Sequence, residues 1–335
     1  MAPLSSEAPM AAPAVVVDAL EPAKQNKRYF QTDIVWKNVT VYAIGHLLAV
    51  YGAYLVLTFQ VKIITCIYTF LLLFFASQGI LAGAHRYYSH KTYKAKFPLR
   101  LYLVVANTLA FQNSIWEWAR DHRQHHKYSD TDADPHNANR GFFFSHAGWL
   151  MMRKHPAVIE KGKNIDTSDL EADALVMFQK NHYIRCYIAA TLISSFAIPM
   201  YFWNESVWMC FLIPYALRTV YFYNATWLVN SAAHAFGYKP YDKNIKPREN
   251  KLVSRLTLGE GWHNYHHTFP WDYRAAEYGP GNSMTTAFID ICAKIGWAYD
   301  LRSASDTVIK ARAIRTGDGH HPIAQQQNLQ NHHPH

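Results

Sequence analysis

Four long apolar stretches, grouped in two pairs, constrain the fold of this chain more than any other feature. The first pair covers residues 39–59 and 63–84, and neither stretch contains Lys, Arg, Asp or Glu. The second pair covers residues 186–203 and 207–229, and only the latter carries a charge, at Arg218. A helix of about 20 apolar residues crosses a hydrocarbon core of roughly 30 Å. The stretches therefore predict four membrane-spanning helices in two hairpins, in preference to buried core helices of a soluble protein.

A fifth apolar stretch, residues 99–111, is too short to cross a membrane and predicts an interfacial or buried helix. The charge at Arg218 is expected to face protein or water, because an intramembrane charge is costly. Two hairpins place residues 1–38, 85–185 and 230–335 on one side of the membrane. Nearly all Lys and Arg lie in these segments, so the positive-inside rule makes this side the cytosol. The net charge of +9 then indicates membrane orientation and an anionic ligand, and no nucleic-acid-binding motif is present.

The two ends of the chain are expected to be disordered. Residues 1–32 are rich in Ala and Pro and then charged, without the pattern of a cleavable signal peptide, and form a cytosolic head. Residues 316–335 form a His- and Gln-rich tail of low complexity that is not expected to belong to any site. Residues 33–315 between them hold all the apolar stretches and form the membrane-bound domain.

Histidines are concentrated in three short motifs. "HRQHH" from His122 and "HNYHH" from His263 each place three imidazoles at positions i, i+3 and i+4, on one face of a helix. "HRYYSH" from His85 adds a pair five residues apart. Convergent neutral imidazoles bind metals, and the repeated triplet argues against a solvated helix face that is His-rich by chance. With two crossings between the triplets, eight histidines reach the same membrane face: His85, His90, His122, His125, His126, His263, His266 and His267.

His234, in "NSAAH" just beyond the fourth apolar stretch, is a ninth candidate, and Asn230 lies one helical turn before it. A single histidine near an apolar segment is more often a hydrogen-bonded structural residue, but this one is expected at the same membrane face. Nine histidines exceed the four ligands of a zinc site, the HExxH motif is absent, and the four cysteines are scattered. Imidazole also suits iron and copper, and two iron ions with positions open to O2 are the preferred interpretation.

Carboxylates near the triplets are candidates to support such ligands. Metal-bound histidines usually donate their second N–H to a carboxylate or a carbonyl. Asp130, Asp132 and Asp134 follow the first triplet, and Glu260 precedes the second. A solvated acidic loop is an equally good interpretation at this point.

Five motifs together resemble those of one known family: "GAHRYYSH", "WARDHRQHHKYSDTDADPHN", "RGFFFSHAGWLMMRKHP", "TWLVNSAAH" and "GEGWHNYHHTFPWDYR". They are similar to motifs of the membrane-bound acyl-CoA desaturases of the stearoyl-CoA desaturase type, and most closely to the insect Δ9 and Δ11 members, over roughly residues 33–315. The resemblance implies an all-α integral membrane protein with four transmembrane helices in two hairpins, capped by a cytosolic helical domain that holds a di-iron site. It also implies a multi-pass protein of the endoplasmic reticulum membrane, with both termini and the active site in the cytosol.

The implied activity is an oxidoreductase that inserts a cis double bond, Δ9 or Δ11, into a saturated C14–C18 fatty acyl-CoA and reduces O2 to water, in fatty-acid or sex-pheromone biosynthesis. An unactivated methylene has no acidic proton for a general base, whereas a di-iron site that activates O2 can oxidise it. The electrons would come from NADH through cytochrome b5 reductase and cytochrome b5. Front-end desaturases begin the last histidine cluster with Gln and often carry a fused cytochrome b5 with an HPGG motif. Here the cluster begins with His263 and HPGG is absent, so a separate donor is implied.

The family pattern also implies the site residues, with no catalytic residue beyond the metal ligands. The ligands of two Fe2+ ions would be His85, His90, His122, His125, His126, His234, His263, His266 and His267, with Asn230 acting through water. Residues that match positions near the CoA head group and the start of the acyl chain are Asn38, Arg120, Asp121, Arg153 and Lys154. Residues that match the acyl tunnel are Asn113, Trp118 and Trp227. By composition alone, an Arg–Lys pair is usually solvated surface and a Trp at a membrane edge is usually an interfacial anchor.

The sequence leaves the specificity open. "KPRE", residues 246–249, occupies a stretch that often differs between insect Δ9 and Δ11 enzymes, and it is nearer to "KPSE" than to "LPAQ" without matching either. "HRYYSH" replaces the more common "HRLWSH", so Tyr87 and Tyr88 stand where Leu and Trp are usual. Membrane hydroxylases, decarbonylases and conjugases use the same histidine motifs, and a non-enzymatic membrane metal-binding or scaffold protein is a further alternative.

Overall fold

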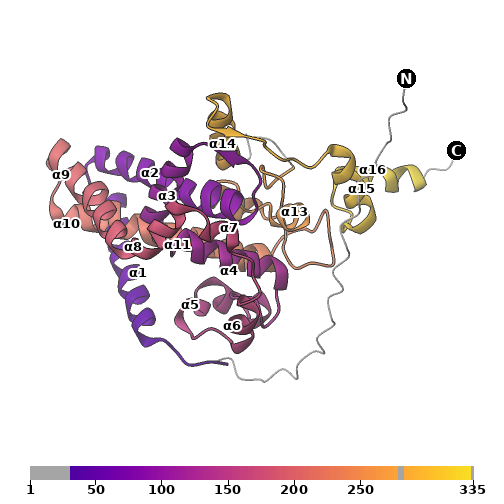
Figure 1. Ribbon diagram of the computed structural model, residues 1–335, viewed down its shortest axis with the longest axis horizontal. Coiled ribbons are helices and arrows are strands. Elements are labelled where there is room, and N and C mark those ends of the chain that lie inside the picture. The colour runs from indigo at the N-terminus through magenta and orange to yellow at the C-terminus, as the bar shows by residue number, and fades with distance from the viewer. Residues whose placement is uncertain (1–30, 278–282, 333–335) are drawn as a thin grey trace. The chain divides into compact units, whose positions relative to one another are not determined.

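The computed structural model describes residues 31–277 and 283–332. Residues 1–30, nearly all of the head expected to be disordered, lie outside the described residues, as do residues 333–335. Residues Thr32–His335 form one compact unit, and helices dominate it (Figure 1).

Three helices in the described residues are long and apolar enough to cross a membrane: Trp36–Leu57, Ile63–Ser89 and Ala174–Trp203. The first is α1 (Trp36–Leu57). The second joins α2 (Ile63–Gln78) directly to the π-helix η1 (Gly79–Ser89). These two helices correspond to the first predicted hairpin.

The third of these helices joins α8 (Ala174–Thr191), η4 (Leu192–Ala197) and α9 (Ile198–Trp203). It begins before the predicted start at residue 186, because Asp173 caps it. The Asp173 carboxylate accepts the N–H groups of the first turn, including that of residue 175 at 3.0 Å.

The predicted fourth span corresponds to α10 (Val207–Cys210), η5 (Phe211–Leu217) and α11 (Arg218–Ala235), which follow one another without a break. Polar side chains along α11 reduce its hydropathy, and this helix is not among the three that qualify by length and composition. Arg218 is buried, and its guanidinium donates to the carbonyl oxygens of Pro214 at 2.8 Å and Leu109 at 3.3 Å. The Arg218 charge therefore faces protein, as predicted.

The short apolar stretch forms α3 (Phe97–Ala110), which packs against η1, α2 and α8. Leu99, Leu103 and Leu109 are buried in these contacts. Of the two alternatives that the sequence allows, a buried or an interfacial helix, the structure shows the buried one.

The remaining segments fold into shorter elements. They are β1 (Lys94–Ala95), α4 (Ile115–Tyr128), η2 (Ala138–Arg140), η3 (Phe144–Gly148), α5 (Trp149–Met151), α6 (Pro156–Gly162), α7 (Ser168–Glu171), α12 (Lys251–Leu256), α13 (His263–Thr268), α14 (Met284–Lys294), β2 (Ala298–Tyr299), α15 (Asp306–Thr316) and α16 (Pro322–His332). The two strands pair with each other in antiparallel orientation and form the only sheet in the described part of the chain.

The C-terminal tail differs from the expected disorder, because α16 follows α15 after a short turn. His321, between the two helices, is buried, and its Nε2 lies 2.9 Å from Oε2 of Glu277. Tyr241 also donates a hydrogen bond to Glu277. These contacts hold the start of the tail against the domain, and they join residues too distant in sequence to be foreseen from composition.

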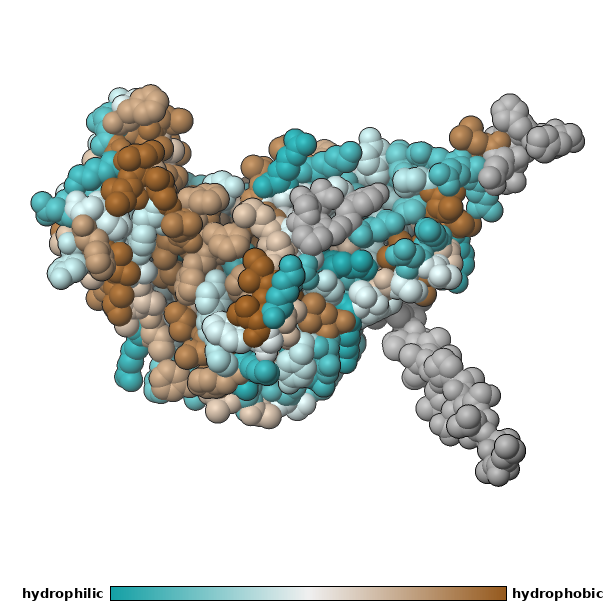
Figure 2. Space-filling model, turned by 90° about the horizontal axis from the view of Figure 1, so that it is seen from above, coloured by the Kyte–Doolittle hydropathy of each residue, from teal (hydrophilic) through white to brown (hydrophobic). Residues whose placement is uncertain are grey.

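Hydrophobic side chains gather on one part of the surface. Figure 2 shows more hydrophobic surface on the side where α2, α9 and α10 lie in Figure 1, and more hydrophilic surface toward α15 and α16. On α1, Leu47 and Leu57 are 72% and 76% exposed. A hydrocarbon solvent would cover such outward-facing apolar side chains, which agrees with helices that cross a membrane.

The start of η1 approaches α3 too closely for a side chain. A Cβ added at Gly79 would lie 2.0 Å from the backbone nitrogen of Asn107 and 2.3 Å from the carbonyl carbon of Ala106. Glycine at this position therefore lets η1, which carries His85, pack directly on α3. Gly45 of α1 has more room, since its nearest neighbouring atom would be 3.6 Å away.

We expect Gly79→Ala to lower the free energy of unfolding by about 1–3 kcal/mol, the usual range for overpacking a core. Gly45→Ala is the matched control, since alanine favours a helix interior over glycine by roughly 0.5–1 kcal/mol. Thermal unfolding of both purified variants in detergent measures the difference. A Gly79→Ala protein as stable as Gly45→Ala would contradict the close packing of η1 on α3.

Candidate metal centre

Four segments of the chain carry the nine histidines of the sequence motifs. η1 carries His85 and ends beside His90, α4 carries the first triplet, the last turn of α11 carries His234, and α13 carries the second triplet. π-Helical turns frequently occur at functional sites. α4 begins with a capping box, in which the Ser114 hydroxyl accepts the N–H of Glu117 and the Glu117 carboxylate accepts the N–H of Ser114.

The first cluster consists of His85, His90, His122 and His266, whose ligand nitrogens all lie within 4.8 Å of one another. The Nε2 atoms of His85 and His266 are 2.9 Å apart, as are those of His90 and His122. His126 joins this cluster, with its Nε2 3.0 Å from Nε2 of His266. Five imidazoles from three parts of the chain thus converge.

The second cluster consists of His125, His234, His263 and His267, with ligand nitrogens again within 4.8 Å of one another. Nε2 of His267 lies 3.2 Å from Nε2 of His125 and 3.2 Å from Nε2 of His263. Nε2 of His234 lies 3.1 Å from Nε2 of His263. The structure therefore brings all nine histidines together in two groups, and each group contains residues of both triplets.

Glu260 contacts His85 through Nδ1, the ring nitrogen that does not face His266. Its Oε2 lies 3.1 Å from His85 Nδ1, and its Oε1 accepts from Arg86 at 2.5 Å. Arg86 is almost fully buried and also donates to the carbonyl oxygen of Tyr273 at 2.9 Å. Arg86 thus fixes Glu260, and Glu260 fixes the His85 ring. Sequence reasoning named Glu260 but missed Arg86, whose burial depends on the fold.

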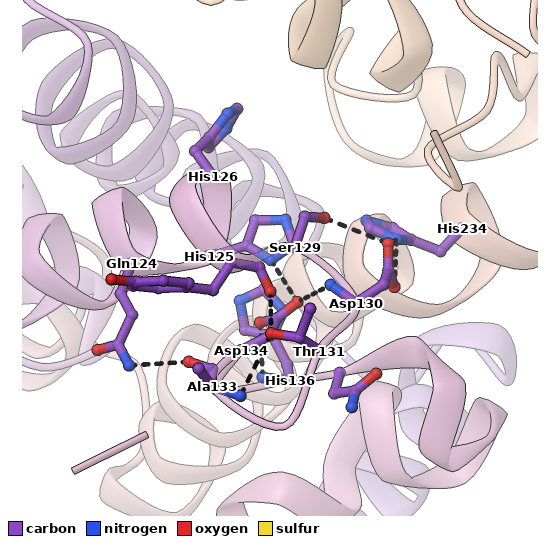
Figure 3. A network of polar contacts seen from close by, with 12 residues as sticks. Gln124, His125, His126, Ser129, Asp130, Thr131, Ala133, Asp134, His136 and His234 are labelled. Atoms are coloured by element: carbon purple, nitrogen blue, oxygen red, sulfur yellow. Dashed lines mark hydrogen bonds and ion pairs between the residues drawn. The ribbon is translucent and has the colours of Figure 1, made fainter. Parts of the chain in front are cut away.

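Two aspartates hold histidines of the second cluster in the same way (Figure 3). Asp134 Oδ2 lies 2.9 Å from Nδ1 of His125, and Asp130 Oδ1 lies 3.2 Å from Nδ1 of His234. A carboxylate on Nδ1 fixes the tautomer that leaves Nε2 free for a metal. Asp130 and Asp134 therefore occupy the supporting position that the sequence suggested, whereas Asp132 is exposed and makes no such contact in the described structure.

Burial, and then the charge of neighbouring imidazoles, lowers the pKa of most of these histidines well below the ordinary value. This holds for His90, His122, His126, His263, His266 and His267. Neutral imidazole is the form that binds metal ions. His125 differs: burial lowers its pKa, but the Asp134 carboxylate outweighs burial and raises the pKa above the ordinary value.

A tenth histidine, His136, packs beside the second cluster and was not singled out from the sequence. Its ring centroid lies 4.3 Å from that of His125, and its Nδ1 lies 3.5 Å from Asp134 Oδ1. Burial lowers the pKa of His136 to about 3. The available signal was the "DPH" sequence, which puts His136 two residues after Asp134.

An apolar pocket lies beside both clusters, and His85, His122, His125 and His263 form part of its wall. The other lining residues are Ile80, Leu81, Trp118, Tyr221, Phe222, Ala225, Thr226, Val229, Asn230, Leu256, Thr257, Leu258 and Glu260. Most of them are apolar, as in sites that bind apolar ligands. Asn230, predicted to act beside the metals, therefore lies in the same wall as the histidines.

The three residues predicted for an acyl tunnel are placed differently around this pocket. Trp118 lines it and stacks on His122, with ring centroids 4.9 Å apart. Trp227 is buried and packs edge-on against Tyr42, and it is not among the lining residues. Asn113, in the loop after α3, has a φ of 70° and does not line the pocket either.

Sequence reasoning missed a polar pair of which one member, Thr226, lines the pocket. Thr226, which precedes Trp227, lines the pocket, and its hydroxyl accepts a hydrogen bond from Nε2 of Gln112 at 2.9 Å. The pair joins α11 to the loop after α3. Nothing in the spacing of these two residues indicates that they meet.

Three of the five residues predicted for the CoA head group and the start of the acyl chain lie together at a different pocket. Arg120, Asp121 and Lys154 all line it. One oxygen of Asp121 lies 2.6 Å from the Arg120 guanidinium and the other lies 2.7 Å from the Lys154 amino group. The Arg153 side chain is 75% exposed, and the Asn38 side chain donates to a carbonyl oxygen of α5 at 2.7 Å.

Comparison with known proteins identifies the family. The family model for fatty acid desaturases matches residues 63–278. The chain belongs to the fatty acid desaturase family. This desaturase is 53% identical over 302 residues to the "Acyl-CoA Delta-9 desaturase" of Acheta domesticus, covering 90% of this chain and 84% of the relative. The resemblance inferred from the motifs is thereby confirmed.

Two further relatives show how broad the similarity is. The human "Stearoyl-CoA desaturase" is 53% identical over 296 residues, covering 87% of this chain and 80% of the relative. The "Acyl-CoA Delta12-desaturase" of Acheta domesticus is 52% identical over 301 residues, covering 90% and 84%. The desaturase therefore resembles insect and mammalian relatives, and relatives named for different double-bond positions, to the same degree.

Glu249, the last residue of the KPRE stretch, fixes the approach of α13 to the clusters. Its buried carboxyl group accepts the N–H of Tyr265, in the first turn of α13, at 2.7 Å. Its backbone pairs with Tyr238 and with Trp262. Burial raises the pKa of Glu249 to about 8, although the backbone N–H groups act in the opposite direction.

Glu249 is expected to make the stability of this desaturase fall as the pH rises from about 4.5 to about 8. The unfolded chain releases the proton near pH 4.5, whereas the folded protein keeps it to about pH 8. In this window the folded state binds more protons, so the free energy of unfolding decreases with pH. We expect Glu249→Gln to flatten this dependence and to be more stable than wild type at pH 8 in thermal unfolding.

The exposed Glu171 provides the control, because Glu171→Gln should keep the wild-type pH dependence. If Glu249→Gln showed the same pH profile as wild type, the Glu249 carboxyl would have to be ionised in the folded protein.

Proposed function

We propose that this protein is a membrane-bound acyl-CoA desaturase that uses O2 to insert a cis double bond into a saturated fatty acyl-CoA. The observation that carries the proposal is the pair of histidine clusters in the wall of an apolar pocket. Relatives 52–53% identical over most of the chain are named acyl-CoA or stearoyl-CoA desaturases. A non-enzymatic metal-binding or scaffold role would not explain why an apolar pocket adjoins both clusters.

The donor set fits two iron ions, one for each cluster. Two nitrogens at about 2.1 Å from one ion are roughly 3.0 Å apart when the bonds are perpendicular, and roughly 3.4 Å apart at a tetrahedral angle. The nearest nitrogen pairs, 2.9–3.2 Å apart, are close enough for the histidines of each cluster to hold one ion, and nine imidazoles without a cysteine would suit iron. Asn230 would act in the same wall through a water molecule. When bound, the two ions supply the O2 activation that an unactivated methylene requires.

The protein's own residues position the substrate and exclude water. Ile80, Leu81 and Phe222 present apolar side chains to the pocket, where an acyl chain would lie against the histidines. Trp118 covers one face of His122. Trp227 does not line the pocket, but it is buried next to Thr226 and would hold this part of α11 in place. Asn113 would act on the pocket wall through its neighbour Gln112, which hydrogen-bonds to Thr226.

The CoA head group is assigned to the pocket at Arg120, Asp121 and Lys154. Phosphate groups bind to such cations through charge-assisted hydrogen bonds. The Arg153 side chain, next to Lys154 in the sequence, extends into solvent. The Asn38 side chain donates to a carbonyl oxygen of α5 and holds this helix in place. The head group would thus remain outside the apolar pocket that receives the acyl chain.

The clusters themselves support four membrane crossings. Each cluster combines a triplet residue that precedes α8 with one that follows α11. An even number of crossings between the triplets puts them on one face, so the helix from Val207 to Ala235 is assigned as the fourth span beside the three apolar ones. We place the protein in the endoplasmic reticulum membrane, surrounded by lipid, with its termini and active site in the cytosol. Cytochrome b5, reduced by NADH-cytochrome b5 reductase, is the proposed electron donor.

The position of the new double bond and the preferred chain length are not determined by similarity. Two cricket relatives named for different positions, Delta-9 and Delta12, are 53% and 52% identical to this chain. Regiochemistry depends instead on which carbon pair the pocket holds against the histidines.

Expression in yeast that lacks its own acyl-CoA desaturase is expected to yield monounsaturated fatty acids, two hydrogens lighter than their precursors. Mass spectrometry of the double-bond positions distinguishes Δ9 from Δ11 activity. His125→Ala removes a ligand of the second cluster, and we expect no product and fewer than two iron ions per chain. His320→Ala, at an exposed histidine outside both clusters, is the control. Products heavier by one oxygen would instead identify a hydroxylase, and conjugated double bonds a conjugase.

Lys154→Ala is expected to raise the KM for acyl-CoA by about tenfold, which corresponds to roughly 1.4 kcal/mol, and to leave kcat unchanged. The reason is that a head-group contact stabilises the ground state and the transition state equally. Initial rates over a range of acyl-CoA concentrations measure both constants. Lys310→Ala, at an exposed lysine outside this pocket, is the matched control. A lower kcat at unchanged KM would contradict the head-group assignment.

A further inference from the structure

A basic pocket, lined by Phe142, Ser231, His234, Lys239, Lys246 and Arg248 together with three small residues, borders the second cluster. It shares no lining residue with the apolar pocket or with the pocket at Asp121. Neither the acyl chain nor the CoA head group is therefore assigned to it. Its position next to a metal-binding histidine calls for a different occupant.

Two of the three cations of the basic pocket are held mainly by backbone contacts, and the Asp318 carboxylate accepts the backbone N–H of Lys239 at 2.6 Å. Lys239 donates its amino group to the carbonyl oxygen of Lys243 at 3.2 Å, and Arg248 donates to that of Gly237 at 3.1 Å. In the part of the chain that the structure describes, no carboxylate forms an ion pair with Lys239, Lys246 or Arg248. Burial, and then the charges of Arg248 and Lys246, lower the pKa of Lys239, although the carboxylates of Asp318 and Asp130 act in the opposite direction. Three cations held together in this way create a positive potential that attracts an anionic partner.

His234 connects the basic pocket to the second cluster. It lines the pocket, and its Nε2 lies 3.1 Å from Nε2 of His263. Beside the cations, the rings of Phe142 and Phe236 lie 6.2 Å apart and are 46% and 61% exposed. Cations around a small apolar patch are features of a surface that binds another protein.

The proposed reaction needs electrons that its substrate does not supply. Conversion of –CH2–CH2– to –CH=CH– releases two electrons and two protons, whereas reduction of O2 to two waters consumes four of each. The balance is R–CH2–CH2–R′ + O2 + 2 e⁻ + 2 H⁺ → R–CH=CH–R′ + 2 H2O. Two electrons per turnover must therefore enter from a separate reductant at the surface of the protein.

We propose that the basic pocket is the docking site of an acidic one-electron carrier protein, which delivers electrons to the second cluster through His234. This inference rests on the proposed function, because that reaction creates the need for electrons. Acidic side chains of the carrier pair with Lys239, Lys246 and Arg248, and its apolar edge covers Phe142 and Phe236. Charge pairing of this kind accelerates association without tight binding, as suits a carrier that leaves after each electron.

The test uses the full chain, loaded with iron, in nanodiscs of phosphatidylcholine, and the reduced soluble domain of cytochrome b5 as the carrier. Lys239→Glu and Lys246→Glu reverse charges at the basic pocket. Lys294→Glu, at an exposed lysine of α14 outside the pocket, is the matched control. The two readouts are the Kd of the carrier and the rate at which its haem is reoxidised, and neither requires a lipid product.

At low salt we expect each pocket variant to raise the Kd, and to lower the second-order rate of haem reoxidation, by about tenfold or more. The difference should shrink at 1 M salt, where the screening length falls to about 3 Å, and the control should match wild type. Equal Kd and rate constants in wild type and pocket variants would overturn the proposal. Pocket variants that bind the carrier normally but lose binding to phosphatidylserine vesicles would also overturn it and assign the pocket to anionic lipid.

A separate arm tests the proposed function alone. Wild type and pocket variants are reduced chemically with dithionite and then given acyl-CoA and O2. We expect both to form equal amounts of product, and this result would support a role of the pocket in electron delivery only. Loss of product in the chemically reduced pocket variants alone would overturn that role. If wild type oxidises the carrier at a rate that depends on Lys246 but forms no product from any acyl-CoA, the docking site stands and the desaturase proposal fails.

Discussion

The convergence of nine imidazoles from four parts of the chain is the interaction on which the rest of this structure depends. In each of the two clusters the ligand nitrogens lie within 4.8 Å of one another, and the nearest Nε2 pairs are 2.9–3.2 Å apart in a largely buried site. Protonated imidazoles at that spacing would repel one another, and burial keeps most of them neutral. Carboxylates on Nδ1 of His85, His125 and His234 favour the tautomer whose Nε2 carries a lone pair directed into the cluster, where a metal ion can accept it. The arrangement is therefore that of a metal site whose ligands the fold holds in place.

The two clusters are supported by different parts of the protein. His85 of the first cluster lies on η1, which packs on α3 through Gly79 and is fixed by the buried Arg86 and Glu260. The second cluster depends on α13, which is tied by Glu249 to the segment after α11. Changes at the η1–α3 contact should therefore act first on the first cluster. Changes near Glu249 should act on both clusters, because α13 also carries His266 of the first cluster.

Much of the metal site could be predicted from sequence because helical spacing alone puts the histidines of each triplet on one face. The supporting residues could be predicted only where they are close in sequence, as with Asp134 nine positions after His125. Arg86 and the contact of Gln112 with Thr226 depend on which helices pack together, and no local pattern encodes that packing. The same limit explains α16, whose preceding residue, His321, is held by a distant glutamate. Three of the four predicted spans qualify by length and hydropathy, whereas the stretch that carries Arg218 does not, because polar side chains along α11 lower its hydropathy.

The KPRE stretch, residues 246–249, supports the histidine clusters without lining the apolar pocket. None of its four residues lines the apolar pocket. Lys246 and Arg248 line the basic pocket, the carbonyl oxygen of Pro247 accepts from Asn264 at 3.0 Å, and Glu249 binds the first turn of α13. Substitutions here would move α13, and with it the second cluster, relative to an acyl chain held by other residues. In the proposed reaction the carbon pair that reacts would be the one nearest the histidines, so a shift of α13, which also carries His263 of the pocket wall, would change which pair that is.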